Sequence, residues 1–212
     1  PVGAFALSEP EAGSNPAEMS TVARPVEGGD GTVEGYVIDG EKQWITNGER
    51  SGVVVVFAKT DPGDPESVTQ FLVPKDADGL AVGEKEDKLG LRASDTTSLV
   101  FDDVRVPAAY RLTDPGLAAA FSVLTGGRIG IAAQSVGLGQ AALDAAVDYA
   151  GDREQFDRPI AEFQSVRHKL ADMWTDLRAA RLLTWDAARR QDAGEDARTA
   201  ASMAKYVASE TA

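Results

Sequence analysis

The chain has 212 residues, enough to bury a sizeable core as one large domain or, the division favoured here, two smaller ones. Its 21 basic and 34 acidic residues give a net charge of −13 at pH 7, and this surface field disfavours nucleic acids and anionic membranes as partners. The absence of cysteine and the single histidine, His168, argue against disulfides, thiolate catalysis and a metal cluster.

No apolar run approaches the roughly 20 residues that a membrane-spanning helix needs. The start shows no basic segment followed by an apolar stretch, so a cytoplasmic location is the default expectation. An acidic excess of this size is also typical of halophilic proteins, which keep a strongly hydrated surface. Because the first residue is Pro1 and a helical pattern continues to Ala212 without a stop signal, both ends look cut.

Strand-like patterns dominate residues 1–106, which we predict to form an antiparallel β domain. The alternating or β-branched runs lie at residues 22–26, 32–38, 53–57, 68–73 and 98–101. Asp39-Gly40 falls between Ile38 and the strand that contains Trp44. This residue pair predicts a tight type I′ turn, because both central positions of that turn need a positive φ.

The segment from Phe5 to Ser14 ends a short apolar strand at Ser8 and then turns at Glu9-Pro10. After the turn, Gly13-Ser14 offers backbone N–H groups and a hydroxyl. Backbone donors aimed into a concavity can hold a phosphate or a planar heterocycle without a cationic side chain. The simpler interpretation is a strand end followed by a polar surface turn.

The stretch from Lys42 to Gly48 reads as a strand in which Trp44 and Thr46 point to one face and Ile45 to the other. A tryptophan beside a threonine could stack on a tricyclic ring and donate a hydrogen bond to it. The alternative is a tryptophan that only fills the core. The later stretch 89–96 has, by contrast, a structural role as its first interpretation.

Two prolines and a glycine mark residues 107–116 as a linker, and after it the apolar period changes from two to about 3.6. We therefore predict part of an antiparallel helical bundle over residues 117–212. The expected apolar stripes of its first three helices comprise Leu117, Phe121, Leu124, Ile131 and Leu138, then Phe163, Val166, Leu170, Met173 and Leu177, and finally Ala200, Ala204, Val207 and Thr211. Single polar residues such as His168 fall beside these stripes.

Two segments of the helical half could bind phosphate. Arg153 and Arg158 flank an interruption at Pro159, beside a helix start, where guanidinium groups and helix N–H groups suit a pyrophosphate. Both arginines could equally be solvated surface charges. Gly126-Gly127 lies early in a helix, where each glycine costs about 1 kcal/mol relative to alanine. Close approach of a ligand or tight packing against another helix would explain the pair.

Taken together, these motifs resemble the acyl-coenzyme A dehydrogenase family over nearly the whole chain. They are Phe5-Ala-Leu-Ser-Glu-Pro-Glu-Ala-Gly-Ser14, Lys42-Gln-Trp-Ile-Thr-Asn47, Leu124-Thr-Gly-Gly-Arg128 and Arg153-Glu-Gln-Phe156 with Pro159-Ile160. The resemblance implies the middle β domain and the first part of the C-terminal helical domain of a flavoprotein. It also implies a homotetramer or dimer, FAD as cofactor, an acyl-CoA substrate and an electron-transfer flavoprotein as electron acceptor.

By the same resemblance, Phe5, Leu7 and Ser8 line the pyrimidine side of the flavin, and Ser14 touches flavin or substrate phosphate. Trp44 shields the ring, and the Thr46 hydroxyl bonds the nitrogen that accepts hydride. Arg128 is the cation for the coenzyme arm of the substrate. The full set of cofactor-binding residues implied is Phe5, Leu7, Ser8, Gly13, Ser14, Trp44, Ile45, Thr46, Arg153, Gln155, Phe156 and Gln164. The chain departs from the family at Asp157, where glycine is usual.

Oxidation of an acyl thioester needs a carboxylate in an apolar pocket to remove the α proton. The family carries this glutamate either on a late helix, beyond Ala212, or at the position held here by Gly127. We therefore expect no catalytic base among these residues and an inactive fragment. Two alternatives remain open: a flavin-dependent oxidase or monooxygenase of the same fold, and a non-catalytic binding protein with the same flavin cradle.

Overall fold

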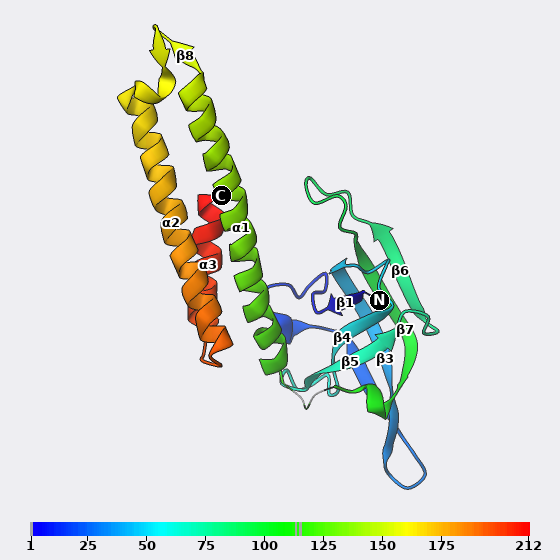
Figure 1. Ribbon diagram of the computed structural model, residues 1–212. Coiled ribbons are helices and arrows are strands. Elements are labelled where there is room, and N and C mark those ends of the chain that lie inside the picture. The colour runs from blue at the N-terminus through cyan, green and yellow to red at the C-terminus, as the bar shows by residue number, and fades with distance from the viewer. Residues whose placement is uncertain (1, 113, 115) are drawn as a thin grey trace. The chain divides into compact units, whose positions relative to one another are not determined.

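The computed structural model describes residues 2–112, 114 and 116–212 (Figure 1). The chain forms two compact units, one up to residue 119 and one from residue 120. Pro1, in the predicted β domain, and Thr113 and Pro115, in the predicted linker 107–116, lie outside the described residues. The predicted fold class, a β domain followed by antiparallel helices, is confirmed.

A curled sheet makes up the first unit. Its strands are β1 (Gly3–Ala6), β2 (Val22–Glu27), β3 (Val33–Thr46), β4 (Val53–Lys59), β5 (Val68–Pro74), β6 (Leu80–Lys85) and β7 (Thr96–Pro107). They are ordered β1-β4-β2-β3-β7-β6, and β5 pairs with β4. The pairing is antiparallel except that β1 runs parallel to β4 and β2 meets β4 in parallel at one residue pair. Short 3-10 helices cover Pro16–Glu18 and Ala108–Tyr110.

Alternation in these strands places one set of side chains in a common core. Val54 and Val56 of β4 are fully buried, as are Ile38 of β3 and Leu99 of β7. The Phe71 ring of β5 lies 4.8 Å, centroid to centroid, from another core ring. The β-branched residues that predicted the strands therefore also supply the interior.

The predicted type I′ turn at Asp39-Gly40 is wrong, because β3 runs without a break from Val33 to Thr46. Gly40 has a φ of +150°, and a Cβ there would lie 2.8 Å from the Cα of Thr21. The glycine is therefore required by a close backbone approach, not by a turn. The Asp39 carboxylate instead accepts a hydrogen bond of 2.8 Å from the N–H of Asp103, at a bulge in β7. The chain reverses earlier, at residues 28–32.

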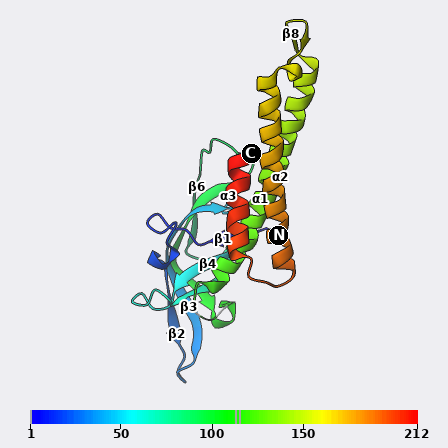
Figure 2. The ribbon, with the colours of Figure 1, turned by 90° about the vertical axis from the view of Figure 1, so that its left-hand side faces the viewer.

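The second unit contains α1 (Ala118–Asp152), α2 (Gln164–Asp192) and α3 (Arg198–Thr211). A small hairpin of β8 (Glu154–Gln155) and β9 (Arg158–Pro159), followed by a 3-10 helix (Ile160–Glu162), connects α1 to α2. Figures 1 and 2 show α1 and α2 side by side with this hairpin at their shared end, and α3 beside α2. No helix in the described part of the chain is both long and apolar enough to span a membrane.

The core between these helices consists mainly of small side chains. Its buried members are Ala132, Val136, Leu143, Leu177, Ala180, Ala187, Ala201, Ala204 and Ala208. In α3 the predicted stripe is confirmed in Ala204, and Ala200 and Val207 pack against the same cluster. In α1 it is wrong, because Ile131 and Leu138 are 46% and 61% exposed. Apolar residues of α1 lie on all sides of the helix, so periodicity alone could not identify the face that packs against α2 and α3.

Candidate functional site

The segment from Phe5 to Ser14 forms the predicted strand and turn, but β1 ends at Ala6 and not at the predicted Ser8. The Phe5 ring is half-buried and lies 4.9 Å from a core phenylalanine ring in an edge-on arrangement. Leu7 is buried, and Ser8 is half-buried at the start of the turn. Two backbone hydrogen bonds between Glu9 and Ala12, of 3.0 and 3.2 Å, close that turn. Gly13 and Ser14 follow as exposed residues at the surface.

A β-bulge presents Trp44 at the surface of the sheet. On β3 three residue steps separate Lys42 from Ile45, whereas two steps separate their partners on β7. Trp44 takes a φ of +58° at this bulge, and its side chain is 57% exposed. Thr46 is also exposed, whereas Ile45 is 2% exposed and lies in the core. The predicted division of faces is confirmed, and the interpretation of Trp44 as a core filler is wrong.

The turn after Ser8 and the Trp44 strand are joined directly. The N–H of Gln43 donates a 2.9 Å hydrogen bond to the carbonyl of Ser8. The neighbouring residue, Lys42, donates through Nζ to the carbonyl of Leu7 at 3.1 Å and to Oε1 of Glu9 at 2.7 Å. Consecutive residues of β3 therefore bind consecutive carbonyls of the other segment.

Lys42 and Glu9 form an ion pair inside the first unit, with side chains 0% and 2% exposed. Burial raises the pKa of Glu9, but Lys42 and the N–H of Ser20 favour the carboxylate more strongly and lower that pKa to about 2. Burial also lowers the pKa of Lys42 to about 8, although Glu9 opposes this shift. The pair is therefore ionised at neutral pH. Sequence reasoning missed it, because Glu9 and Lys42 lie 33 residues apart.

A second polar anchor holds the turn that follows Thr46. Asp95 is 1% exposed, and its carbonyl accepts a 3.1 Å hydrogen bond from the N–H of Asn47. The Asp95 carboxylate accepts another, of 3.0 Å, from the N–H of Glu49. Lys75 donates through Nζ to the carbonyl of Gly48. The end of β3 is thus fixed by a residue just before β7 and by one just after β5. The contacts of Asp95 support the structural interpretation of residues 89–96.

In the second unit, the β8–β9 hairpin turns at Phe156-Asp157. Both residues have a positive φ, 54° and 60°, as a two-residue type I′ loop requires. The Phe156 side chain is 86% exposed and meets the ring of Phe163 edge-on at 6.1 Å. The guanidinium carbon of Arg158 lies 4.2 Å from the centroid of the same Phe163 ring, which makes a cation–π contact.

Asp157 adopts the left-handed conformation that glycine adopts freely, so its presence in place of glycine does not disrupt the turn. We expect Asp157→Gly to keep the hairpin with little change in stability. Asp157→Val should lower the free energy of unfolding by about 1–2 kcal/mol, because a β-branched residue is strained at this φ. Urea denaturation of both variants measures the difference, and equal stabilities would contradict the assigned turn.

The residues predicted to bind the dinucleotide gather around this hairpin. Arg153, Gln155 and Gln164 are exposed, and Gln164 is the first residue of α2. The backbone of Arg153 is fixed, because its carbonyl accepts a 2.8 Å hydrogen bond from the N–H of Ile160. Among the described residues, the Arg153 side chain takes part in no ion pair, so its charge is available to an anion.

Arg128 does not share this location. It lies on α1 about 25 residues before the hairpin, and at about 1.5 Å per residue this separates the two by roughly 40 Å. Of the neighbouring glycines, Gly126 is approached by the side chain of Gln191, which would lie 3.3 Å from a Cβ added there, whereas Gly127 faces open space. Packing between helices therefore explains Gly126, and Gly127 stays a candidate for ligand approach.

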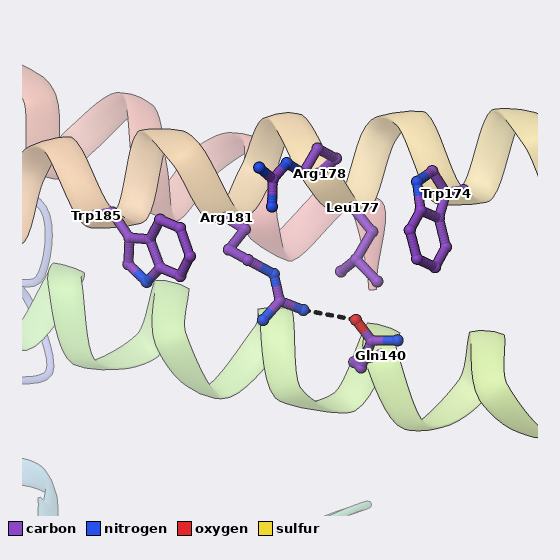
Figure 3. Close-up of a pocket in the computed structure, with 6 residues that line it drawn as sticks. All are labelled: Gln140, Trp174, Leu177, Arg178, Arg181 and Trp185. Carbon is purple, nitrogen blue, oxygen red and sulfur yellow. Dashed lines mark hydrogen bonds between the residues drawn. The ribbon is translucent and has the colours of Figure 1, made fainter.

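A separate pocket of about 240 Å³ lies between α1 and α2. It is lined by Gln140, Trp174, Leu177, Arg178, Arg181 and Trp185. Figure 3 shows Gln140 on α1 facing the other five residues, which come from α2, and Arg181 donates to Gln140 Oε1 at 2.6 Å. None of the predicted site residues lines this pocket.

Comparison with known proteins finds two family models that together match nearly the whole chain. Residues 4–104 match the family model "Acyl-CoA dehydrogenase, middle domain", and residues 114–212 match "Acyl-CoA dehydrogenase, C-terminal domain". The chain is 47% identical to the short-chain specific acyl-CoA dehydrogenase of Bos taurus mitochondria, over 100% of its own length and 50% of that protein. The chain thus spans about half the length of the curated relatives it matches.

Solved structures agree with these relatives. The butyryl-CoA dehydrogenase of Megasphaera elsdenii superimposes with a TM-score of 0.92 at 41% identity, covering 100% of this chain and 55% of that one. A glutaryl-CoA dehydrogenase from Mycobacterium smegmatis, solved in complex with FADH2, gives a TM-score of 0.88 at 37% identity, with coverages of 99% and 52%. These similarities confirm the family resemblance drawn from the motifs.

Proposed function

Because this chain belongs to the acyl-CoA dehydrogenase family, we propose that the complete protein introduces a trans-2,3 double bond into acyl-CoA thioesters with FAD as cofactor. The observation that carries the proposal is the exposed pair of Trp44 and Thr46 on a bulged strand. This strand is bonded directly to the turn that exposes Gly13 and Ser14. A tricyclic ring beside these residues would meet an indole face, a hydroxyl and backbone donors.

Each residue would have a distinct task. When bound, FAD supplies the acceptor for the hydride that leaves the β carbon of the substrate. Trp44 would cover one face of the ring, and the Thr46 hydroxyl would donate a hydrogen bond to the ring nitrogen at which the flavin accepts hydride. Phe5, Leu7 and Ser8 border the pyrimidine end. Because the side chains of Leu7 and Ile45 are buried, these two residues would contribute main-chain atoms.

The adenine end of a dinucleotide requires a second set of contacts. We propose that Arg153, Gln155, Phe156 and Gln164 hold it in a dimer or tetramer, where the flavin bound mainly by one subunit meets the hairpin of another. The exposed Phe156 ring supplies an aromatic surface, and Arg153 supplies a charge without an ion-pair partner in the described chain. Arg128 would bind the coenzyme arm of the substrate.

The proton from the α carbon needs a base that these residues do not provide. Gly127 has no side chain to accept a proton, so we propose a carboxylate outside the 212 residues. Electrons would then pass from the reduced flavin to an electron-transfer flavoprotein. We also propose that the protein is cytoplasmic and comes from a salt-adapted source, which the net charge of −13 supports.

The test is a turnover assay with the complete protein, FAD, butyryl-CoA and an artificial electron acceptor. We expect reduction of the acceptor and formation of the enoyl product, and none with the 212-residue chain alone. A complete protein that stays colourless in excess FAD would overturn the proposal in favour of a non-catalytic binding protein. Rapid reoxidation of the reduced flavin by air would favour an oxidase.

Thr46→Val should slow flavin reduction in the complete protein about tenfold, because the variant loses one hydrogen bond worth about 1–1.5 kcal/mol to the reacting nitrogen. Valine has nearly the same shape, and the side chain is exposed, so stability should hardly change. Stopped-flow absorbance measures the reduction rate. Thr46→Ser keeps the hydroxyl and should stay close to the unmodified protein. An unchanged rate in Thr46→Val would remove Thr46 from the proposed mechanism.

A further inference from the structure

The Glu9–Lys42 ion pair joins the two segments that carry the proposed flavin wall, which consists of the Ser8–Ser14 turn together with Trp44 and Thr46. Glu9 follows Ser8 in the chain and precedes Ser14 by five residues, and Lys42 precedes Trp44 by two and Thr46 by four. One buried contact of 2.7 Å therefore links the two segments whose surface groups would meet the cofactor. Neither charged group is itself exposed, so neither can touch a ligand.

The donors and acceptors around the pair are arranged to fix this link. Glu9 Oε2 accepts from the N–H of Ser20 at 2.6 Å and from its hydroxyl at 2.8 Å, and Oε1 accepts from the N–H of Thr21 at 3.1 Å. Lys42 Nζ reaches the Leu7 carbonyl as well as Glu9. The Glu9 carboxylate thus connects three stretches of the chain, namely the Ser8–Ser14 turn, the Ser20-Thr21 segment and β3.

We infer that Glu9 and Lys42 are positioning residues, which hold the Ser8–Ser14 turn at a fixed spacing from Trp44 and Thr46 so that the flavin wall is formed before the cofactor arrives. A buried ion pair is a poor source of net stability, because desolvation of both charges offsets their attraction. It does specify one geometry, because each charge is satisfied in only one arrangement. The inference rests on the proposed function, since it concerns the same flavin wall.

The cofactor affinity should depend on this arrangement. Without the pair, the turn could take several positions relative to β3, so FAD would bind more weakly and would still meet the turn at varying distances from Thr46. Backbone bonds alone would remain between the segments, chiefly the one from Gln43 to Ser8. The loss should therefore reach both the binding of FAD and the reactivity of bound FAD, because the hydroxyl at Thr46 and the donors on the turn would no longer act at a set distance.

The experiment uses the complete protein and the double variant Glu9→Gln/Lys42→Met, which removes both charges and leaves neither unpaired. FAD binding is titrated by quenching of flavin fluorescence, and the rate of flavin reduction by butyryl-CoA is then measured with the site saturated in FAD. We expect the dissociation constant for FAD to rise about tenfold and the reduction rate at saturation to fall about tenfold. Arg105→Met, which breaks the exposed pair with Asp103 at 3.1 Å, is the matched control and should change neither quantity.

The outcomes separate the inference from the function on which it rests. If the unmodified protein binds no FAD, the proposed function fails. If it binds FAD and the double variant matches it in affinity and rate, the positioning role is overturned. Weaker binding with a normal rate at saturation also overturns it, because the groups on the turn and at Thr46 would then keep their spacing without the pair. Should the double variant not fold, Ser20→Ala removes only the hydroxyl donor to Glu9. This variant should shift both quantities in the same direction by about twofold, and no shift would overturn the inference.

Discussion

Lys42→Met is expected to lower the free energy of unfolding by about 3–5 kcal/mol at pH 7, because it leaves the buried Glu9 carboxylate without its cation. Met has a similar length to the aliphatic part of lysine, so loss of packing contributes little. Ser20 and Thr21 would still donate to the carboxylate, but neutral donors do not replace a charge. Urea denaturation, followed by a spectroscopic signal from each of the two units, measures the change in the free energy of unfolding.

Comparison of Lys42→Met with the double variant Glu9→Gln/Lys42→Met separates the cost of an unpaired buried charge from the loss of the ion pair itself. Burial lowers the pKa of Lys42 even beside Glu9, so the buried ammonium is costly to the folded state. Removing both charges in Glu9→Gln/Lys42→Met should therefore destabilise the protein less than Lys42→Met alone. Arg105→Met at the exposed pair with Asp103 should cost at most about 1 kcal/mol. If Lys42→Met lowered the free energy of unfolding by less than about 1 kcal/mol, the Glu9 carboxylate would not depend on Lys42 in the folded state.

The sequence was most informative where local pattern and tertiary structure agree. The β-branched runs and the change of period after the predicted linker led to the correct fold class, because burial of one face imposes a period of two on strands and of 3.6 on helices. The edge strand β6 was missed. Most of its side chains are exposed or half-buried, so an apolar alternation never develops there.

The sequence-based predictions were wrong or incomplete where a residue's role depends on contacts with a segment that is distant in the sequence. Asp39-Gly40 has the composition of a hairpin turn, but Gly40 is needed because Thr21 approaches its backbone. The Glu9–Lys42 contact was invisible for a similar reason. In sequence, Glu9 belongs to a polar turn and Lys42 to a strand, and no periodicity relates two side chains from separate elements. The motif around each residue was recognised, whereas the bond between the motifs required the structure.

Acidification should lower the free energy of unfolding in part because the buried Glu9 carboxylate becomes protonated. Its ordinary pKa of 4.5 falls to about 2 in the folded protein, where Lys42 and the surrounding donors outweigh the effect of burial. The unfolded chain therefore binds the proton first as the pH drops. The contribution of Glu9 is complete above pH 4.5 and is lost between that value and about 2. At about 1.4 kcal/mol per pKa unit, the complete loss is about 3–4 kcal/mol.

Urea denaturation at pH 6 and pH 3 gives the measurable part of this effect, about 2 kcal/mol. Other carboxylates also titrate there, and Arg198 lowers the pKa of the exposed Asp196 to about 2. The double variant Glu9→Gln/Lys42→Met isolates the buried pair, because it keeps every other acid and should lose about 2 kcal/mol less stability on acidification. Asp196→Asn should retain most of the dependence, because solvent screens this exposed pair with Arg198. If the double variant and the unmodified protein lost stability equally, Glu9 would not be ionised and paired in the folded state, and the link between the turn and β3 would have to rest on backbone hydrogen bonds alone.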